Sequence, residues 1–102
     1  MGDAGTVIET MTFRLTAGAD EAAFLAADYR VQTEFIPNLP GFVRRTTARG
    51  SEGDWLVVTL WRTEADADGA AALEDGHDAV NAFVSFVDAN SIARARFTEL
   101  EG

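Results

Sequence analysis

Apolar and polar positions alternate in the first part of the chain. Within residues 6–16, one set of alternate positions holds Val7, Glu9, Met11 and Phe13, and the other set is mainly polar. A period of two residues is typical of a β-strand with one buried face. We therefore expect a strand whose apolar side chains point toward the core, with the Glu9 side chain on the same side.

The period then changes to that of a helix. Phe24, Asp28, Val31 and Phe35 recur at intervals of three to four residues, which is typical of one helix face. The proline at position 37 disfavours helical backbone at the residue before it. We expect a helix over 20–36 that ends near its last two residues.

The remaining pattern completes a known order of elements. Residues 41–50 and 54–63 are strand-like and are joined by a glycine-rich turn. A helical region follows and is broken at Gly76, and residues 92–100 alternate again. Strand, helix, strand, strand, helix, strand is the ferredoxin-like βαββαβ order. We therefore expect an α+β fold, a four-stranded antiparallel sheet with its helices on one face.

The third predicted strand is apolar on both of its faces. One face holds Trp55, Val57, Thr59 and Trp61. The opposite face holds Leu56, Val58 and Leu60. A sheet face exposed to water is normally polar. Because the helices cover one face only, we expect the other face to meet a second copy of the chain across a two-fold axis.

Composition narrows the class of protein. The 102 residues suit a single domain, 1–102, and the net charge of −9 opposes binding to nucleic acid phosphates. The absence of cysteine excludes disulfides and cysteine-ligated zinc. We see no signal peptide pattern and no apolar run near the length that spans a membrane. We therefore expect a cytoplasmic protein that binds neither membranes nor nucleic acids.

Three segments resemble a known family. They are FRLTAGADEAAF at 13–24, PGFVRRTTAR at 40–49 and WLVVTLWRTEADA at 55–67. In this order and spacing they resemble the antibiotic biosynthesis monooxygenase-like family of the dimeric α/β-barrel superfamily. The resemblance implies a homodimeric barrel with a pocket in each subunit, between the sheet and its own helices. Members include cofactor-free oxygenases of polycyclic phenols, haem-degrading enzymes and quinol oxygenases, so the fold does not fix the reaction.

The same resemblance speaks against haem. The haem-degrading members carry an asparagine where this chain has Met11, and an iron-ligating histidine near Ala70 and Ala71. The acidic residues 64–78 lack the spacing of a calcium-binding loop. We therefore expect no cofactor and no metal ion.

His77 is the candidate catalytic residue. It is the only histidine, and an imidazole ordinarily titrates near neutral pH, as a general base should. Its spacing to Val80 and Val84 places it on an inward stripe if it is helical. The alternative is a histidine beside Gly76 that caps the helix or is solvated.

The candidate substrate-binding residues are those expected along the pocket wall. A flat aromatic lining suits a planar or apolar ligand, and the resemblance matches Trp61 to a tryptophan that faces the pocket in several members. The set is Trp61, Met11, Phe13, Phe83, Thr59 and Glu9. The alternative for the aromatic residues is core packing. Glu9 is either a half-buried carboxylate able to act as a base or a side chain that reaches water.

Two arginines of the last predicted strand are expected on the sheet face opposite the pocket. Arg94 and Arg96 alternate with Ala93, Ala95 and Phe97. Small and aromatic residues suit packing under helices, so we expect the arginines on the dimer side of the sheet.

The sequence leaves two classes of function open. The first is a small cofactor-independent monooxygenase acting on an aromatic or polyketide-like molecule, in which His77 accepts a phenolic proton. The second is a non-catalytic, dimeric small-molecule-binding or accessory module.

Overall fold

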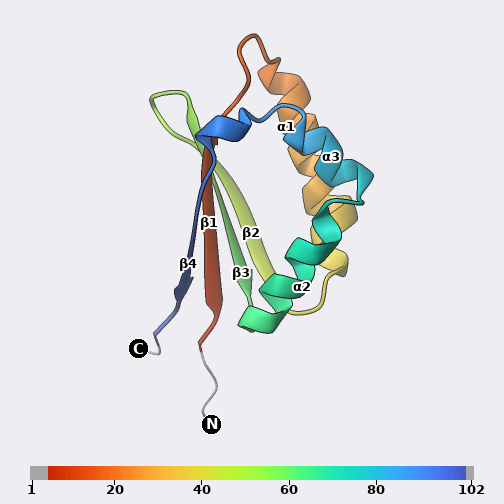
Figure 1. Cartoon of the computed structure of the whole chain (residues 1–102), viewed down its shortest axis with the longest axis vertical. Helices are drawn as coiled ribbons and strands as arrows, with labels where there is room; N and C mark the ends of the chain where they lie inside the picture. The colour runs from red at the N-terminus through yellow and green to blue at the C-terminus, as the bar shows by residue number, and fades with distance from the viewer. Residues whose placement is uncertain (1–4, 101–102) are drawn as a thin grey trace.

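The computed structural model describes residues 5–100 and contains one antiparallel sheet (Figure 1). Its strands lie in the order β2-β3-β1-β4. Their bounds are β1 Val7–Arg14, β2 Phe42–Arg49, β3 Asp54–Trp61 and β4 Ala93–Thr98. The two central strands, β1 and β3, pair in full, with Val7 opposite Trp61 and Phe13 opposite Trp55. The ferredoxin-like α+β fold predicted from the sequence is confirmed.

The longer helices lie together on one face of this sheet (Figure 1). The helical segments of this layer are α1 Glu21–Arg30, η1 Val31–Phe35, η2 Ile36–Asn38, α2 Glu64–Glu74 and α3 Asp78–Val84. The short η3 helix, Ala89–Ser91, lies at one end of the sheet, just before β4. The side chains of Asp20 and Thr63 cap α1 and α2 by accepting hydrogen bonds from backbone amides. Within residues 5–100, no helix is both long enough and apolar enough to cross a bilayer.

The first helical region is longer and less regular than expected. The α-helix ends at Arg30, and the chain continues as a π-helix in η1 and a 3-10 turn in η2. The helical backbone therefore does not end at the residue before Pro37. This proline lies at the start of the 3-10 turn, where a missing amide N–H costs little. Phe24, Val31 and Phe35 are buried along this region, as the helical period predicted.

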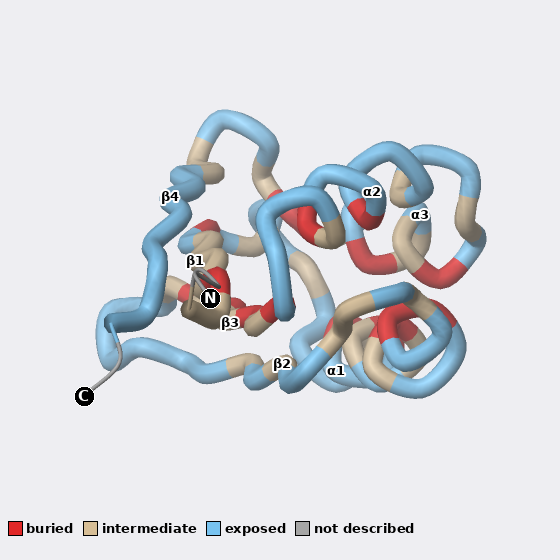
Figure 2. Tube along the Cα trace, turned by 90° about the horizontal axis from the view of Figure 1, so that it is seen from below, coloured by how far each residue is buried: buried red, intermediate tan, exposed pale blue. Residues whose placement is uncertain are grey.

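The core lies between the sheet and the helices (Figure 2). Phe24 of α1 is at its centre, with ring centroids 4.9 Å from Trp55, 5.2 Å from Phe83 and 5.9 Å from Phe13. Edge-on and tilted contacts of this kind are the favoured geometry for aromatic pairs. This cluster fixes α1 and α3 over the two central strands.

A buried ion pair fastens α1 to β2. Arg45 Nη2 lies 2.9 Å from Asp28 Oδ1, and the two side chains are only 5% and 15% exposed. Asp28 also accepts a 2.9 Å hydrogen bond from Thr47 Oγ1, and Gln32 accepts one from Arg45. Asp28 can lie on the inward face of the helix because its carboxylate is paired with a cation rather than solvated.

The other face of the sheet carries apolar side chains without a covering helix. Leu56, Val58 and Leu60 of β3 point to this face, beside Ile8 of β1. Phe97 of β4 pairs with Ile8 and is 55% exposed. This is the face that the sequence predicted to be apolar and uncovered by helices.

The arginines of β4 point the opposite way from the sequence-based expectation. Arg94 pairs with Met11 and Arg96 pairs with Glu9, so both share the helix side with these residues. Arg96 reaches the acidic helix α2, where it contacts Asp68. The expectation was wrong because it placed the small and aromatic residues of this strand under the helices, whereas Arg96 turns to that side and pairs with acids of α2.

Candidate functional site

A cavity of about 120 Å³ lies between the sheet and the helices and is partly open to solvent. Its floor comes from the sheet, mainly from β1 and β3 with residues of β2 and β4, and its cover comes from η1, α3 and the end of α2. Five of the predicted site residues contribute to its lining: Glu9, Met11, Thr59, Trp61 and Phe83. Most of the remaining lining is aliphatic. This position, between the sheet and the chain's own helices, is the one that the resemblance implied.

Trp61 is a fixed aromatic wall of this cavity. It is the last residue of β3 and is only 2% exposed. Its indole Nε1 donates a 2.8 Å hydrogen bond to Oε1 of Glu9, which lies diagonally across the β1–β3 pair. Phe42 packs edge-on against the indole, with centroids 6.0 Å apart. The ring therefore has a defined orientation before any ligand enters.

Glu9 belongs to a charged network at the edge of the cavity. Its second oxygen, Oε2, accepts a 2.8 Å hydrogen bond from Nη2 of Arg96. Arg96 Nη1 donates to Asp68 at 2.8 Å and lies 3.5 Å from Glu64. The hydrogen bonds to Asp68 and then Glu9 raise the pKa of Arg96 above its ordinary value. Both oxygens of Glu9 are thus occupied, and α2 is tied to β4.

Thr59, Met11 and Phe83 complete the sequence-predicted part of the lining. Thr59 is a buried polar residue on β3, and Met11 is half-buried on the neighbouring strand. Phe83 of α3 is buried, and the guanidinium carbon of Arg45 lies 5.7 Å from its ring centroid. The cavity therefore combines an apolar surface with a hydroxyl and a cation.

Phe13 does not line the cavity. It is 1% exposed and packs edge-on against Phe83, with centroids 5.6 Å apart, and against Phe24. The sequence correctly placed Phe13 on the inward face of β1, but the rings of the aromatic core cover it there. The expectation that it contacts a ligand is corrected to a core position.

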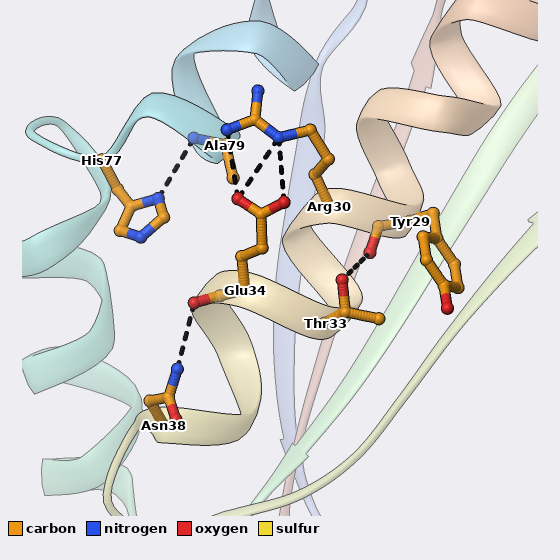
Figure 3. Close-up of polar contacts among 7 residues, drawn as sticks. All are labelled: Tyr29, Arg30, Thr33, Glu34, Asn38, His77 and Ala79. Atoms are coloured by element: carbon orange, nitrogen blue, oxygen red, sulfur yellow. Dashed lines mark hydrogen bonds and ion pairs between the residues drawn. The ribbon is translucent and has the colours of Figure 1, made fainter.

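His77 also lies outside the cavity lining. Its Nδ1 accepts a 3.1 Å hydrogen bond from the backbone amide of Ala79 (Figure 3), and its ring centroid lies 4.8 Å from that of Phe35. Helix α2 ends at Glu74 and a short turn through Gly76 follows, so the next helix begins at Asp78 and His77 becomes its N-cap. The expected inward position is therefore corrected to the capping alternative. The structure does not bring His77 together with the other predicted residues.

Glu74 is a lining residue that the sequence analysis missed. It is the last residue of α2, and its side chain faces the cavity. Ala67 and Ala70, the buried residues of this helix, precede it by seven and four positions, so all three share one stripe. That spacing was visible in the sequence. The acidic residues of this segment, however, were weighed only as a possible calcium-binding loop.

The environment of Glu74 disfavours its charged form. Burial raises the pKa of its carboxyl above the ordinary value, and this effect outweighs the opposing influence of Arg94 and Arg45. The neighbouring charges of Glu9 and Asp75 raise it further. Within residues 5–100, no side chain or amide donates a hydrogen bond to the Glu74 carboxyl. The group is therefore free to interact with a molecule in the cavity.

The lining offers no ligand set for a metal or a haem iron. No histidine, cysteine or tyrosine of the described range lines the cavity. Residues 5–100 hold no cluster of three or more histidine, cysteine, aspartate or glutamate side chains placed to bind a metal ion. Ala70, near where the resemblance puts an iron-binding histidine, is 3% exposed and packs in the core.

Comparison with solved structures identifies the same fold in several other proteins. SnoaB, a cofactor-independent oxygenase from Streptomyces nogalater, matches with a TM-score of 0.79 and 20% identity over 97% of both chains. A protein from Bordetella bronchiseptica, for which an antibiotic biosynthesis monooxygenase activity is proposed, matches with 0.78 and 15% over 95% of this chain and 99% of that one. A dimeric ferredoxin-like protein of unknown function from Thermobifida fusca matches with 0.70 and 13% over 93% and 92%.

These matches establish the fold, and the structural likeness to antibiotic biosynthesis monooxygenase-like proteins that the sequence predicted is confirmed at that level. No family model matches the sequence, and no curated protein matches it. Identities this low leave the residues of the site to be judged on their own chemistry.

Proposed function

We propose that this protein is a small cofactor-independent oxygenase that acts on a planar aromatic molecule held in the cavity between the sheet and the helices. The observation that carries the proposal is the composition of that cavity. An oriented tryptophan and aliphatic walls surround a small number of polar groups, which is the usual make-up of a small-molecule site. The oxygenase activity described for SnoaB, on the same fold, supports the choice of reaction.

The size of the cavity limits the substrate. Its volume of about 120 Å³ is close to the cavity of about 150 Å³ that holds one benzene molecule. One aromatic ring therefore fits beside Trp61, and a polycyclic substrate would extend its other rings through the open side. Trp61 and Phe83 would contact the ring, with Met11 and Thr59 below it.

The reaction needs no metal or organic cofactor if the substrate itself supplies the electrons. Loss of an acidic proton from a phenol or from the CH2 group of an anthrone gives an electron-rich anion that can react with O2. The carbon gains one oxygen atom, the CH2 becomes a carbonyl, and the second oxygen atom leaves as water. The protein's part is to bind the ring, accept the proton and exclude water.

We propose further that the chain is a homodimer joined through the open sheet face. Leu56, Val58, Leu60, Ile8 and Phe97 make that face apolar, and a second copy would remove it from water. The dimeric protein from Thermobifida fusca with the same fold supports this arrangement. The two sheets would then form the α/β barrel.

Oxygen consumption tests the proposed activity. Purified protein is mixed with a series that runs from single-ring hydroquinones to tricyclic anthrones, and O2 uptake and product mass are followed. We expect catalysed uptake above the buffer rate for at least one member, with one oxygen atom from ¹⁸O2 in the product. Uptake equal to buffer for every member would contradict the proposal.

A second function is favoured by one specific observation. The only histidine caps α3 instead of lining the cavity, so the cavity lacks the side chain that most often serves as a general base. A non-catalytic, small-molecule-binding module is the alternative. Saturable binding of an aromatic ligand without turnover in the same series would select it.

A further inference from the structure

Two carboxyl groups line the cavity, and they are in opposite situations. Glu9 is engaged on both oxygens, by the indole N–H of Trp61 and by the guanidinium group of Arg96. Glu74, at the end of α2, has no ion pair with a described residue. A carboxylate whose lone pairs are already bound is a weak proton acceptor, whereas an unengaged and desolvated one is a stronger acceptor.

The charged groups that influence Glu74 lie on three strands and on the residue next to it. Arg94 of β4 and Arg45 of β2 are the cations, and Glu9 of β1 and the adjacent Asp75 are the anions. Arg45 is already paired with Asp28, while Arg94 lines the cavity without an ion pair to any residue in the described range. A negative charge that develops on a bound molecule near Glu74 would therefore meet the unpaired guanidinium group of Arg94.

We propose that Glu74 is the proton acceptor of this cavity. Its carboxylate takes the acidic proton of the bound aromatic molecule, and Arg94 stabilises the substrate anion that results. The proposal rests on the proposed function, and it transfers to Glu74 the role that the sequence suggested for His77.

The proton transfer is balanced as follows. A C–H or O–H bond of the substrate breaks, an O–H bond forms on Glu74, and the electron pair stays on the substrate. O2 then adds to the anion, and the proton returns from Glu74 to the terminal oxygen of the peroxide. That return restores the carboxylate. The hydroperoxide then loses its remaining C–H hydrogen as the O–O bond breaks, so that water leaves and the carbonyl product forms.

The burial of Glu74 suits this role. A general base works best when its pKa lies close to the operating pH. Burial raises the pKa of the Glu74 carboxyl from its ordinary position toward that range. The sequence alternative, His77, has its Nδ1 occupied by the Ala79 amide and is not in the lining.

Anaerobic deuterium exchange isolates the proton step from the reaction with oxygen. Anthrone is incubated with protein in D2O without O2, and exchange at its CH2 group is followed by NMR. We expect the wild type to accelerate exchange above the buffer rate. Glu74→Gln should lower that acceleration by about a hundredfold, since general-base catalysis contributes roughly 10²–10⁴-fold. Glu74→Asp should retain part of it.

Controls separate a lost base from a lost fold. Glu52→Gln removes the same charge from the exposed β2–β3 turn and should exchange anthrone at the wild-type rate. Binding of anthrone, followed by tryptophan fluorescence, should persist in Glu74→Gln. Wild-type exchange in a folded Glu74→Gln variant would overturn the proposal.

The outcomes also separate this inference from the proposed function. Glu74-dependent exchange without aerobic O2 uptake would support Glu74 as the base and overturn the oxygenase. O2 uptake by the wild type with exchange that does not depend on Glu74 would support the oxygenase and overturn this inference. A wild type that catalyses neither exchange nor uptake would overturn both.

Discussion

The indole Nε1 of Trp61 donates a 2.8 Å hydrogen bond to Oε1 of Glu9, and this contact joins the wall of the cavity to its charged edge. Glu9 also accepts a hydrogen bond from Arg96, and Arg96 donates a second one to Asp68 of α2. The first of these contacts sets the orientation of an aromatic ring, and the last one connects helix α2 to the sheet. The cavity is preorganised by its own side chains, which is the property that a binding site for a rigid planar molecule requires.

Trp61→Phe should show how much this contact contributes. The variant removes the donor and leaves Oε1 of Glu9 without its partner, in a part-buried position. A hydrogen bond to a charged group contributes about 1.5–3 kcal/mol, so we expect the free energy of unfolding to fall by about that amount. Urea denaturation measures it. Trp55→Phe is the matched control for ring size, because Trp55 lies outside the cavity lining. Equal losses in the two variants would assign the effect to packing alone.

His77 can be tested with two substitutions that differ in capping. His77→Ala removes the acceptor of the Ala79 amide and should cost about 0.5–2 kcal/mol of stability. His77→Asn keeps a capping side chain but lacks the basic ring, so its stability should stay within a few tenths of a kcal/mol of the wild type. If the cavity has a different base, both folded variants should keep the turnover rate. A large loss of turnover in a stable His77→Asn would return the catalytic role to His77.

The stability of the protein should depend on Glu74 with a sign that is unusual for a carboxyl group. Because its pKa is raised in the folded state, the native protein holds this proton more tightly than the unfolded chain does. Its contribution is therefore most favourable below the ordinary carboxyl pKa and is lost as the pH rises through the raised value. We expect Glu74→Gln to be more stable than the wild type at neutral pH, with the difference disappearing near pH 4. Urea titrations across this range measure it, and a variant less stable than the wild type at neutral pH would contradict the burial argument.

The open sheet face makes a prediction about assembly. Val58→Asp places a charge at the middle of the apolar face, opposite the helix side of β3, where it should leave the fold of the chain intact. Light scattering should give about twice the chain mass of 11.0 kDa for the wild type and the single-chain mass for the variant. Thr12→Asp, on the more polar and exposed end of the same face, is the milder control. A wild type that is monomeric at micromolar concentration would contradict the proposed dimer.

Much of the fold was predictable because alternation is a strong signal in this sequence. The two parities of β3 separate buried Trp55 and Trp61 from Leu56 and Leu60 on the open face, as the sequence indicated. The place of Glu9 on the inward side of β1 followed from the same rule. Alternation could not say which face of β4 turns inward, because one face holds alanines and Phe97 and the other holds arginines. The inward position of Arg96 depends on its ion pair with Asp68 of α2, a residue distant in the sequence.

The sequence predicted the strand residues that line the candidate site better than it predicted the ionisable residues. Trp61, Met11 and Thr59 line the cavity because strand parity places them there. His77 was misplaced because the stripe argument assumed a helix that in fact begins one residue later. Glu74 follows Ala67 and Ala70 at helical spacing, so it could have been found from the sequence. Its burial, however, depends on how the end of α2 lies against the rest of the cavity lining, which no local pattern reveals.

The measurement that bears most directly on the central claim is the response of the two indole N–H resonances to an aromatic ligand. Trp61 lines the cavity and Trp55 does not, and the Trp61→Phe variant assigns their signals. We predict that a planar phenol or anthrone, added without O2 to ¹⁵N-labelled protein, shifts the Trp61 signal saturably and leaves the Trp55 signal in place. Signals that both stay unchanged at saturating ligand, or a shift confined to Trp55, would contradict the claim that this cavity is the functional site.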